Sequence, residues 1–173
     1  MILVISSTNR PKSFTRKVAD HYYSLLQERN IESELLYLED LPSGFFDAAV
    51  YAKKEGEVRN LIDTKLAPAK KFVFIVPEYN GSFPGILKLM IDTVEIKKCF
   101  HGKKAGIVGV SSGRSGNLRG IDHLMSVLNH VRVQLMPNQP KLSSIESGIG
   151  EDGDLIGDYE TRIKKHVEDI AAF

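Results

Sequence analysis

The sequence is short of cysteine, of long apolar runs and of net charge, and each shortage argues against a class of protein. Cys99 is the single cysteine of the 173-residue chain, so we expect no intramolecular disulfide and a reducing compartment, the cytoplasm. No segment approaches the roughly 20 apolar residues that cross a bilayer, and the start lacks the basic flank of a signal peptide. A formal net charge of +1 without a basic block argues against nucleic acid or an anionic membrane as a partner.

Clusters of catalytic or metal-ligating side chains are also missing. No Ser/His/Asp or Cys/His arrangement stands out, and the aspartates of residues 152–158 are too irregularly spaced for a calcium loop. The histidines are scattered, and we expect most of them at the surface: His21, His101, His123, His130 and His166. Cys99 is expected to be an incidental thiol. Such a chain suits chemistry that a bound cofactor supplies.

The apolar positions predict one α/β domain over residues 1–173. Four runs rich in β-branched residues predict buried strands, at residues 2–5, 35–38, 72–76 and 106–110. Their nearly continuous hydrophobicity is typical of parallel strands covered on both faces. A fifth, more mixed run at residues 131–136 suits the edge of a sheet.

Helical periodicity fills the intervals between these strands. Apolar residues repeat at helical spacing in five segments, at residues 18–26, 58–65, 86–94, 121–131 and 159–170. Because strand and helix alternate, we predict a doubly wound, five-stranded parallel sheet in the flavodoxin-like order 2-1-3-4-5, with helices on both faces. Residues 41–55 and 137–154 are irregular, and we expect them to be surface excursions.

Three loops of unusual composition meet at one edge of this predicted sheet. Strands 1, 3 and 4 are neighbours in the order 2-1-3-4-5, and ligands bind in the crevice at their carboxyl ends. The first loop, SSTNRPKSFT at residues 6–15, offers hydroxyls, Arg10 and a helix N-terminus that Ser13 is placed to cap. These groups suit a terminal phosphate monoester, and the lack of glycine excludes a dinucleotide loop or a P-loop. The alternative is a polar turn with a serine cap and a solvated arginine.

The second loop lies in FIVPEYNGSFPG, residues 74–85, where an apolar strand stops at one proline and a helix starts near another. Pro77 cannot continue a strand ladder and Gly81 can take a positive φ, so we expect the backbone groups between them to be free to face a planar heterocycle. Asn80 can donate and accept hydrogen bonds, and Tyr79 can present its ring or its hydroxyl. The alternative is an ordinary connection with Asn-Gly as its turn.

The third loop is SSGRSGNLRG, residues 111–120. Its glycines let the backbone approach a ligand, and its serines can form hydrogen bonds. The glycine spacing matches a dinucleotide fingerprint only in part, because the first Gly-x-Gly is missing. Arg114 and Arg119 allow two interpretations, solvated or functional.

Together the loops resemble the NADPH-dependent FMN reductase family of flavodoxin-like proteins, which includes quinone, chromate and azo reductases. The strongest match is PEYNGSFPGILKLMID, residues 77–92, to the family's Pro-Glu-Tyr-Asn-Gly…Pro-Gly…Lys…Asp signature. The first loop is similar to a Gly-Ser-x-Arg…Ser segment, with Ser6 in place of glycine and Arg10 one position late. The third is similar to Ser-x-Gly-Gly-x-x-Gly, with Arg114 in place of the second glycine. The likeness spans nearly the whole chain.

The resemblance implies bound FMN, with NADPH or NADH as electron donor, and it assigns ligands by position. The FMN phosphate would be held by Ser7, Asn9, Arg10, Ser13, Phe14 and Thr15. The ribityl chain and isoalloxazine would contact Pro77, Glu78, Tyr79, Asn80 and Gly81. The pyrimidine edge would meet Ser111, Ser112 and Gly113.

The implied function is an oxidoreductase with a ping-pong cycle. NAD(P)H reduces bound FMN, and a quinone, azo compound, metal oxyanion or flavin then takes the electrons; no catalytic side chain or metal is implied. Two alternatives stay open: a flavodoxin-type electron carrier, against which the near-neutral charge argues, and an interaction protein that binds no flavin. The family is usually dimeric or tetrameric, so we expect a homodimer or homotetramer. Four phenylalanines are candidates for an apolar interface or for the core: Phe45, Phe46, Phe83 and Phe100.

Overall fold

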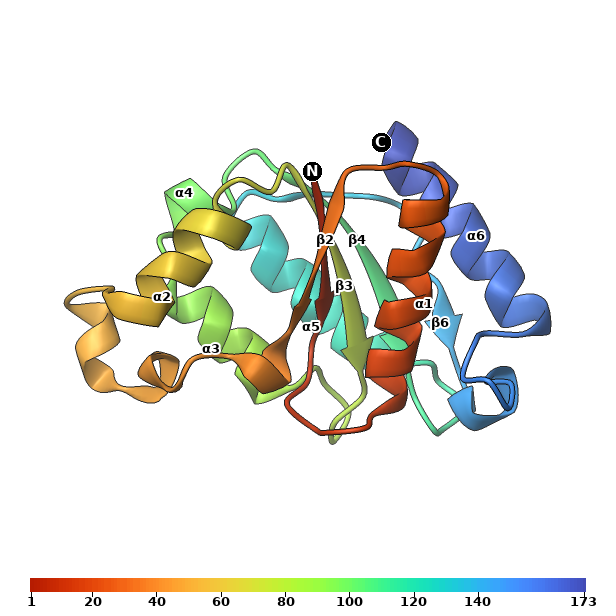
Figure 1. The fold of residues 1–173 in the computed structure, drawn as a ribbon. Coiled ribbons are helices and arrows are strands. Elements are labelled where there is room, and N and C mark those ends of the chain that lie inside the picture. Colours follow the sequence, from red (N-terminus) through yellow and green to blue (C-terminus); the bar gives the residue numbers. More distant parts are fainter.

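A parallel sheet runs through the centre of the molecule, as a computed structural model of residues 1–173 shows (Figure 1). Its strands lie in the order β2-β1-β3-β4-β5, which confirms the predicted order and the flavodoxin-like fold class, and β6 also pairs with β4. The strands are β1 Ile2–Ser6, β2 Ser33–Tyr37, β3 Lys71–Pro77, β4 Lys104–Val110, β5 Gln134–Leu135 and β6 Lys141–Leu142. Because β1, β3 and β4 are adjacent and parallel, the loops that leave their carboxyl ends meet at one edge.

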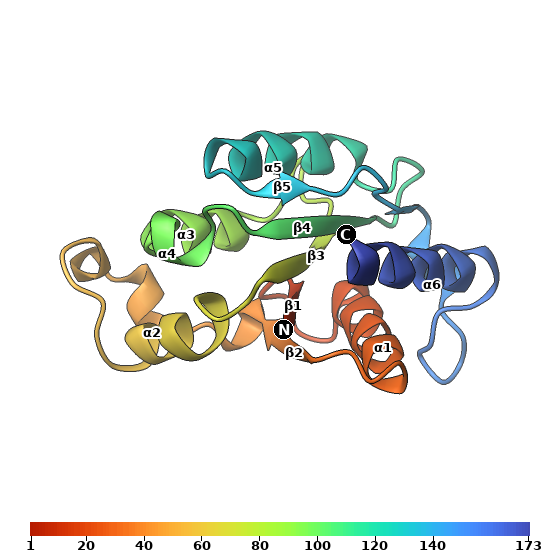
Figure 2. The ribbon, with the colours of Figure 1, turned by 90° about the horizontal axis from the view of Figure 1, so that it is seen from above.

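Helices cover both faces of this sheet (Figure 2). α1 and α6 lie on one face, and α2, α3, α4 and α5 lie on the other. The helices are α1 Phe14–Glu28, α2 Gly56–Leu61, α3 Gly85–Thr93, α4 Ile96–Cys99, α5 Leu118–His130 and α6 Gly157–Ala172. One π-helical turn, Ile62–Leu66, extends α2, and 3₁₀ turns occupy Leu38–Asp40, Ser43–Phe46, Ala48–Tyr51 and Ile145–Gly148. None of the helices combines the length and the apolar composition that crossing a bilayer requires.

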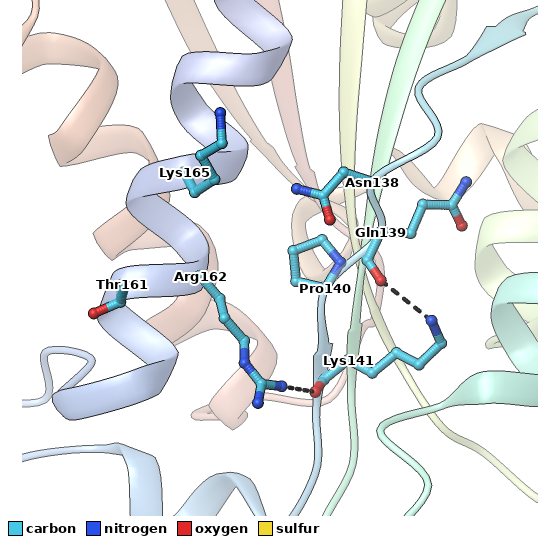
Figure 3. A pocket seen from close by; sticks show the side chains of 7 residues that line it. All are labelled: Asn138, Gln139, Pro140, Lys141, Thr161, Arg162 and Lys165. Atoms are coloured by element: carbon cyan, nitrogen blue, oxygen red, sulfur yellow. Dashed lines mark hydrogen bonds between the residues drawn. The ribbon is translucent and has the colours of Figure 1, made fainter.

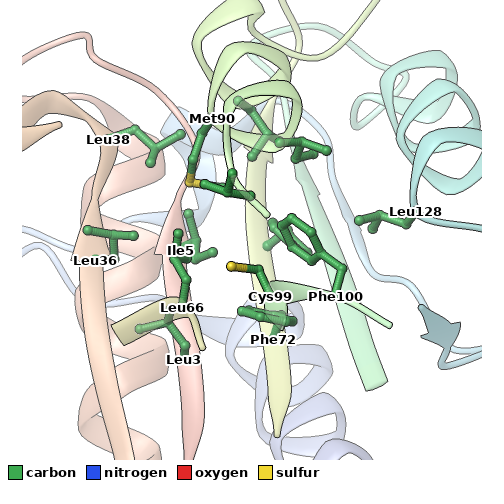
Figure 4. Close-up of a cluster of buried hydrophobic side chains, with 14 of the residues drawn as sticks. Leu3, Ile5, Leu36, Leu38, Leu66, Phe72, Met90, Cys99, Phe100 and Leu128 are labelled. Carbon is green, nitrogen blue, oxygen red and sulfur yellow. The ribbon is translucent and has the colours of Figure 1, made fainter. Parts of the chain in front are cut away.

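Alternate residues of each strand face opposite sides and fill two separate cores. In β1, Ile5 packs on the side of α3 and α5, whereas Val4 packs on the side of α1 and α6. Figure 4 shows the first core, in which the rings of Phe72 and Phe100 pack with centroids 5.4 Å apart. Full burial of such a side chain stabilises the fold by about 1.5–3 kcal/mol. The strands that carry the three loops are therefore firmly held on both faces.

The lone thiol belongs to this first core. Cys99 is fully buried, next to Phe72 and Phe100 (Figure 4). Burial raises the pKa of the Cys99 thiol to about 11. The thiol is therefore protonated at neutral pH and shielded from solvent.

The phenylalanines considered for an interface divide between core and surface. Phe45 and Phe100 are buried and fold back onto the core. Phe83 is half-buried, and Phe46 is 61% exposed. Only Phe46 presents most of its ring to solvent.

The edge of the sheet beyond β4 is divided between two short strands. Val131 still caps α5 and Arg132 takes a left-handed φ of 61°, so pairing begins only at Gln134. The strand expected over residues 131–136 is at the predicted edge but is shorter. Residues 136–140 include two prolines, which cannot donate to a ladder. Pairing with β4 then resumes in β6, inside a stretch expected to be irregular.

Two of the histidines, expected mostly at the surface, are buried. His21 is 8% exposed and bonds Asp154, while His166 is fully buried. His166 Nδ1 lies 2.7 Å from Tyr22 Oη, which joins α6 to α1. The ring lies over Gly106, where a Cβ would stand 2.6 Å from a ring carbon. Burial lowers the pKa of His166 to about 4, so the imidazole is neutral.

Candidate functional site

The end of β3 shows why a proline is tolerated in a central strand. The N–H of Glu78 donates to Val110 O at 2.9 Å, so β3 stays paired with β4 beyond Pro77. On the opposite side β1 has already ended, and its last bond there runs from Ser7 N–H to Ile75 O at 3.0 Å. Backbone groups alternate between the two neighbours, so the missing N–H of Pro77 faces a side without a partner strand. The expectation that Pro77 ends the ladder is right toward β1 and wrong toward β4.

A two-residue hairpin follows. Tyr79 and Ser82 exchange backbone hydrogen bonds of 2.8 and 3.1 Å. Asn80 and Gly81 between them have φ of 51° and 75°, the left-handed conformation that Asn-Gly pairs favour in such turns. The expectation of free backbone groups is therefore wrong for the N–H of Glu78 and Tyr79. It holds for the N–H groups of Asn80 and Gly81, which donate to no protein acceptor.

Side chains tie this second loop to the other two. Thr8 Oγ1 and Tyr79 Oη are hydrogen-bonded at 2.6 Å, which joins the first loop to the second. Ser115 Oγ donates to Glu78 Oε2 at 2.5 Å, which joins the third loop to the second. The buried Asn117 adds a second link there, since its Nδ2 donates to Val76 O at 2.9 Å. The three loops form one connected unit.

The first loop ends in a capped helix with free donors. Ser13 is the N-cap of α1, and its Oγ accepts from Arg16 N–H at 3.1 Å. The N–H groups of Phe14 and Thr15 donate to no protein acceptor, and the first turn of α1 carries no acidic residue. This helix terminus therefore offers donors and positive potential to an anion. Ser7 does not contribute, because it is fully buried and its Oγ donates to Ile5 O.

The third loop is folded around one hydroxyl. Ser111 Oγ accepts from Gly116 N–H at 3.0 Å and donates to Gly113 O at 2.8 Å. Gly116 has a φ of 58°, and a Cβ there would lie 2.6 Å from the Cβ of Lys141. A side chain at this position would be excluded by both conformation and space. Ser112 and Gly113 remain exposed at the rim.

Two adjoining hollows open between the loops. One has a volume of about 220 Å³ and is lined by all three loops together with residues 145–146. The other, of about 450 Å³, is lined by Asn9, Arg10, Glu78, Tyr79 and Asn80. Arg10, Glu78 and Tyr79 line both hollows, so they stand between them.

Most of the residues expected at the site line these hollows. The smaller one is lined by Arg10, Ser13, Phe14, Thr15, Pro77, Glu78, Tyr79, Ser111 and Ser112. Asn9 and Asn80 line the larger one. Ser7, Gly81 and Gly113 line neither.

Sequence reasoning missed four residues that line the smaller hollow: Lys12, Val110, Ile145 and Glu146. Lys12 stands next to the predicted cap and could have been included on that ground. Ile145 and Glu146 carry no sequence signal. Hydrogen bonds bring their turn to the third loop, from Ile145 N–H to Ser111 O at 3.0 Å and from Ser144 N–H to Gly113 O at 2.8 Å.

A family model and two relatives match most of the chain. The family model described as NADPH-dependent FMN reductase matches residues 1–146. A 2-hydroxy-1,4-benzoquinone reductase of a Burkholderia species is 28% identical over 162 residues, covering 91% of this chain and 86% of the relative. An FMN-dependent NADPH-azoreductase of Staphylococcus aureus is 25% identical over 177 residues, covering 99% and 93%.

Solved structures show the same fold. FerB of Paracoccus denitrificans, a flavoenzyme NAD(P)H:(acceptor) oxidoreductase, superposes with a TM-score of 0.79 at 25% identity, covering 99% of this chain and 94% of FerB. Megasphaera elsdenii flavodoxin superposes with a TM-score of 0.66 at 12% identity over the full length of both chains, a likeness of fold alone. Since the family model spans most of the sequence, the chain belongs to the NADPH-dependent FMN reductase family.

Proposed function

We propose that the three loops hold FMN in the hollows between them and that the protein transfers electrons from NAD(P)H to a small acceptor. As a member of its family the chain is an FMN-dependent oxidoreductase that uses a nicotinamide nucleotide as donor. The acceptor class we propose is quinones, azo compounds, metal oxyanions or free flavin. The chemistry of the first loop supports this proposal most directly.

The first loop suits the phosphate of FMN. The free N–H groups of Phe14 and Thr15 lie at the start of α1. Arg10 and Lys12 line the same hollow and form no ion pair, although Glu78 and Glu146 also line it. A phosphate monoester dianion needs several donors and positive charge, and this loop supplies both. We therefore assign the phosphate to Arg10, Lys12, Ser13, Phe14 and Thr15, and we leave out the buried Ser7.

The second and third loops suit the remainder of the cofactor. Pro77, Glu78 and Tyr79 line one side of the smaller hollow, and Ser111 and Ser112 line another. The unpartnered N–H groups of Asn80 and Gly81 are donors for the polar edge of a heterocycle. The bonds among the three loops keep these groups in place before a ligand arrives.

Bound FMN supplies the redox chemistry, in which NAD(P)H, a proton and a quinone become NAD(P)⁺ and a hydroquinone. The protein binds, orients and shields the reacting groups, and no nucleophile or metal of its own is needed. We expect ping-pong kinetics, because donor and acceptor would reach the site through the same opening.

A dimer or tetramer is part of this proposal. Phe46 and Tyr51 are 61% and 58% exposed and lie on neighbouring 3₁₀ turns beside α2. Two large exposed side chains on one short segment suit a contact between copies of the chain. Light scattering tests this, and a monomer at micromolar concentration would exclude it.

A spectrum and one assay test the function itself. Purified protein mixed with excess FMN and passed through gel filtration should keep a yellow flavin spectrum. The loaded protein should then oxidise NADPH when a quinone is added, followed by nicotinamide absorbance. Colourless protein after filtration would contradict FMN binding, and a flavin-loaded protein that consumes no NADPH or NADH would contradict the reductase.

A further inference from the structure

The arginines divide sharply between paired and free. Four donate to protein acceptors: Arg16, Arg29, Arg59 and Arg162. The guanidinium groups of the other four form no hydrogen bond or ion pair: Arg10, Arg114, Arg119 and Arg132. Three of these free groups lie at the site. Arg10 is in the first loop, and Arg114 and Arg119 are in the third loop, residues 111–120, whose last residues form the start of α5.

Figure 3 shows a further polar hollow of the molecule and the side chains that line it. It has a volume of about 510 Å³ between α6 and residues 138–141 and also carries cations. Arg162 is paired with Asp158 at 2.5 Å, and Lys165 is paired with Asp169 at 2.6 Å. Two of the three cations that line that hollow are therefore paired with a carboxylate, whereas Arg10, Arg114 and Arg119 around the three loops are not.

Arg119 is the free arginine whose position is most specific. It lies in the first turn of α5, which has no acidic residue, so the guanidinium adds positive charge to the positive end of the helix. Its Nη1 lies 3.8 Å from where a Cβ of Gly81 would stand, so the side chain reaches the Asn-Gly turn without bonding to it. One turn further, His123 Nδ1 lies 2.9 Å from Ser82 Oγ and holds α5 against the hairpin. Because Arg119 is exposed and unpaired, its guanidinium is available to an anionic ligand at this end of the helix.

The position of Arg119 separates it from the phosphate loop. The first loop touches the hairpin at Tyr79, through Thr8, whereas α5 touches it at Gly81 and Ser82. The FMN phosphate has donors and cations enough in the first loop, and quinones and azo groups need carry no charge. The nicotinamide nucleotide carries phosphate in every turnover.

We propose that Arg119 binds a phosphate group of the nicotinamide nucleotide on the α5 side of the Asn80–Gly81 turn. This inference rests on the proposed function. One charge-assisted hydrogen bond to a phosphate corresponds to about a tenfold change in affinity. Because Arg119 is exposed, its contribution should also weaken as salt is added.

The test compares FMN-loaded wild-type protein with Arg119→Gln, Arg119→Lys and a control, Arg132→Gln. Arg132 is also unpaired and exposed but lies beyond the other end of α5. Titration calorimetry with NADP⁺ measures binding directly, and steady-state assays give the KM for NADPH and for NADH. We expect Arg119→Gln to weaken NADP⁺ binding and raise the KM about tenfold, with the flavin spectrum and kcat retained. Arg119→Lys should recover part of the loss, and Arg132→Gln should match wild type.

Each outcome assigns or removes the contact. Weaker binding of both nucleotides would place Arg119 at the pyrophosphate, and weaker binding of NADPH alone would place it at the 2′-phosphate. If Arg119→Gln bound the nucleotides as tightly as Arg132→Gln does, or changed only the KM of a sulfonated azo acceptor, this inference would be overturned and the proposed function would stand. A wild-type protein that keeps no FMN and oxidises no NADPH would overturn the proposed function and this inference together.

Discussion

Thr8 Oγ1 and Tyr79 Oη lie 2.6 Å apart although 71 positions separate them in the sequence. Thr8 also accepts from the N–H of Arg10 at 3.1 Å, so one hydroxyl connects the tyrosine of the second loop to the arginine of the first. Arg10 and Tyr79 line both hollows. The Thr8–Tyr79 bond therefore fixes the relative position of the group proposed for phosphate and the group proposed for the flavin ring.

Tyr79→Phe removes this link and keeps the ring. Loss of one hydrogen bond costs about 1 kcal/mol, so we expect FMN affinity to fall about fivefold by fluorescence titration. Tyr51→Phe is the control, because Tyr51 is 58% exposed and lines neither hollow. Equal FMN affinity in the two variants would show that the link does not organise the site.

Ser13→Asp separates helix capping from phosphate binding. Aspartate caps a helix as well as serine does and suits the helix dipole, so the free energy of unfolding of apo-protein should hold or rise slightly. The added carboxylate would repel the FMN phosphate, and we expect the dissociation constant for FMN to rise at least about tenfold. Titrations with FMN and with riboflavin, which has no phosphate, measure the difference.

Riboflavin should bind Ser13→Asp and wild type equally. Ser126→Asp, on the exposed side of α5, makes the same charge change away from the site and should leave FMN binding unchanged. Unchanged FMN affinity in Ser13→Asp would contradict the assignment of the FMN phosphate to the start of α1.

Local sequence patterns were sufficient for most of the fold. Strand and helix positions follow from apolar runs and periodicity, since both reflect which face of an element is buried. The strand order was predicted from the alternation of strands and helices, which is typical of a doubly wound sheet. The split edge strand was not predictable in this way. Whether residues 136–140 pair with β4 depends on contacts with Ala105 and Gly109, which are distant in the sequence. The burial of His166 likewise depends on the space left by Gly106.

The site divides along the same line. The turn at Asn80 and Gly81 was predictable, because Asn-Gly pairs favour the positive φ angles that this turn requires. Ile145 and Glu146 were not, because β6 and the bonds to the third loop carry them there. Ser7 stood in a motif position, yet the sheet uses both its N–H and its hydroxyl. Motif position alone does not report whether a polar group is already bonded.

Cys99 should be chemically silent in the folded protein. The thiol is fully buried, so reagents in solution cannot reach it. Its pKa is raised to about 11, so very little of the reactive thiolate is present at neutral pH. Iodoacetamide at pH 8 should label native protein far more slowly than protein unfolded in urea, as mass spectrometry would show. Comparable labelling of the two would mean that the first core opens readily, and it would reopen the question of a role for this thiol.

His166 should make stability depend on pH. Its folded pKa is about 4 against an ordinary 6.5, because burial disfavours the imidazolium. The unfolded chain binds the proton more tightly, so the contribution to stability is complete above pH 6.5 and is lost as the pH falls toward 4. The shift corresponds to about 3 kcal/mol in total, of which about 2 kcal/mol is lost by pH 5.

Urea unfolding at pH 7 and pH 5 measures this loss, with His166→Gln as the comparison. The glutamine is uncharged at both values, so the variant should lose about 2 kcal/mol less than wild type on acidification, even where its stability at pH 7 is lower. His130→Gln, at the exposed end of α5, should retain the wild-type difference. A His166→Gln protein that loses as much stability as wild type would place the acid sensitivity in other groups. The neutral bond between His166 and Tyr22 would then be a packing contact without a role in the pH response.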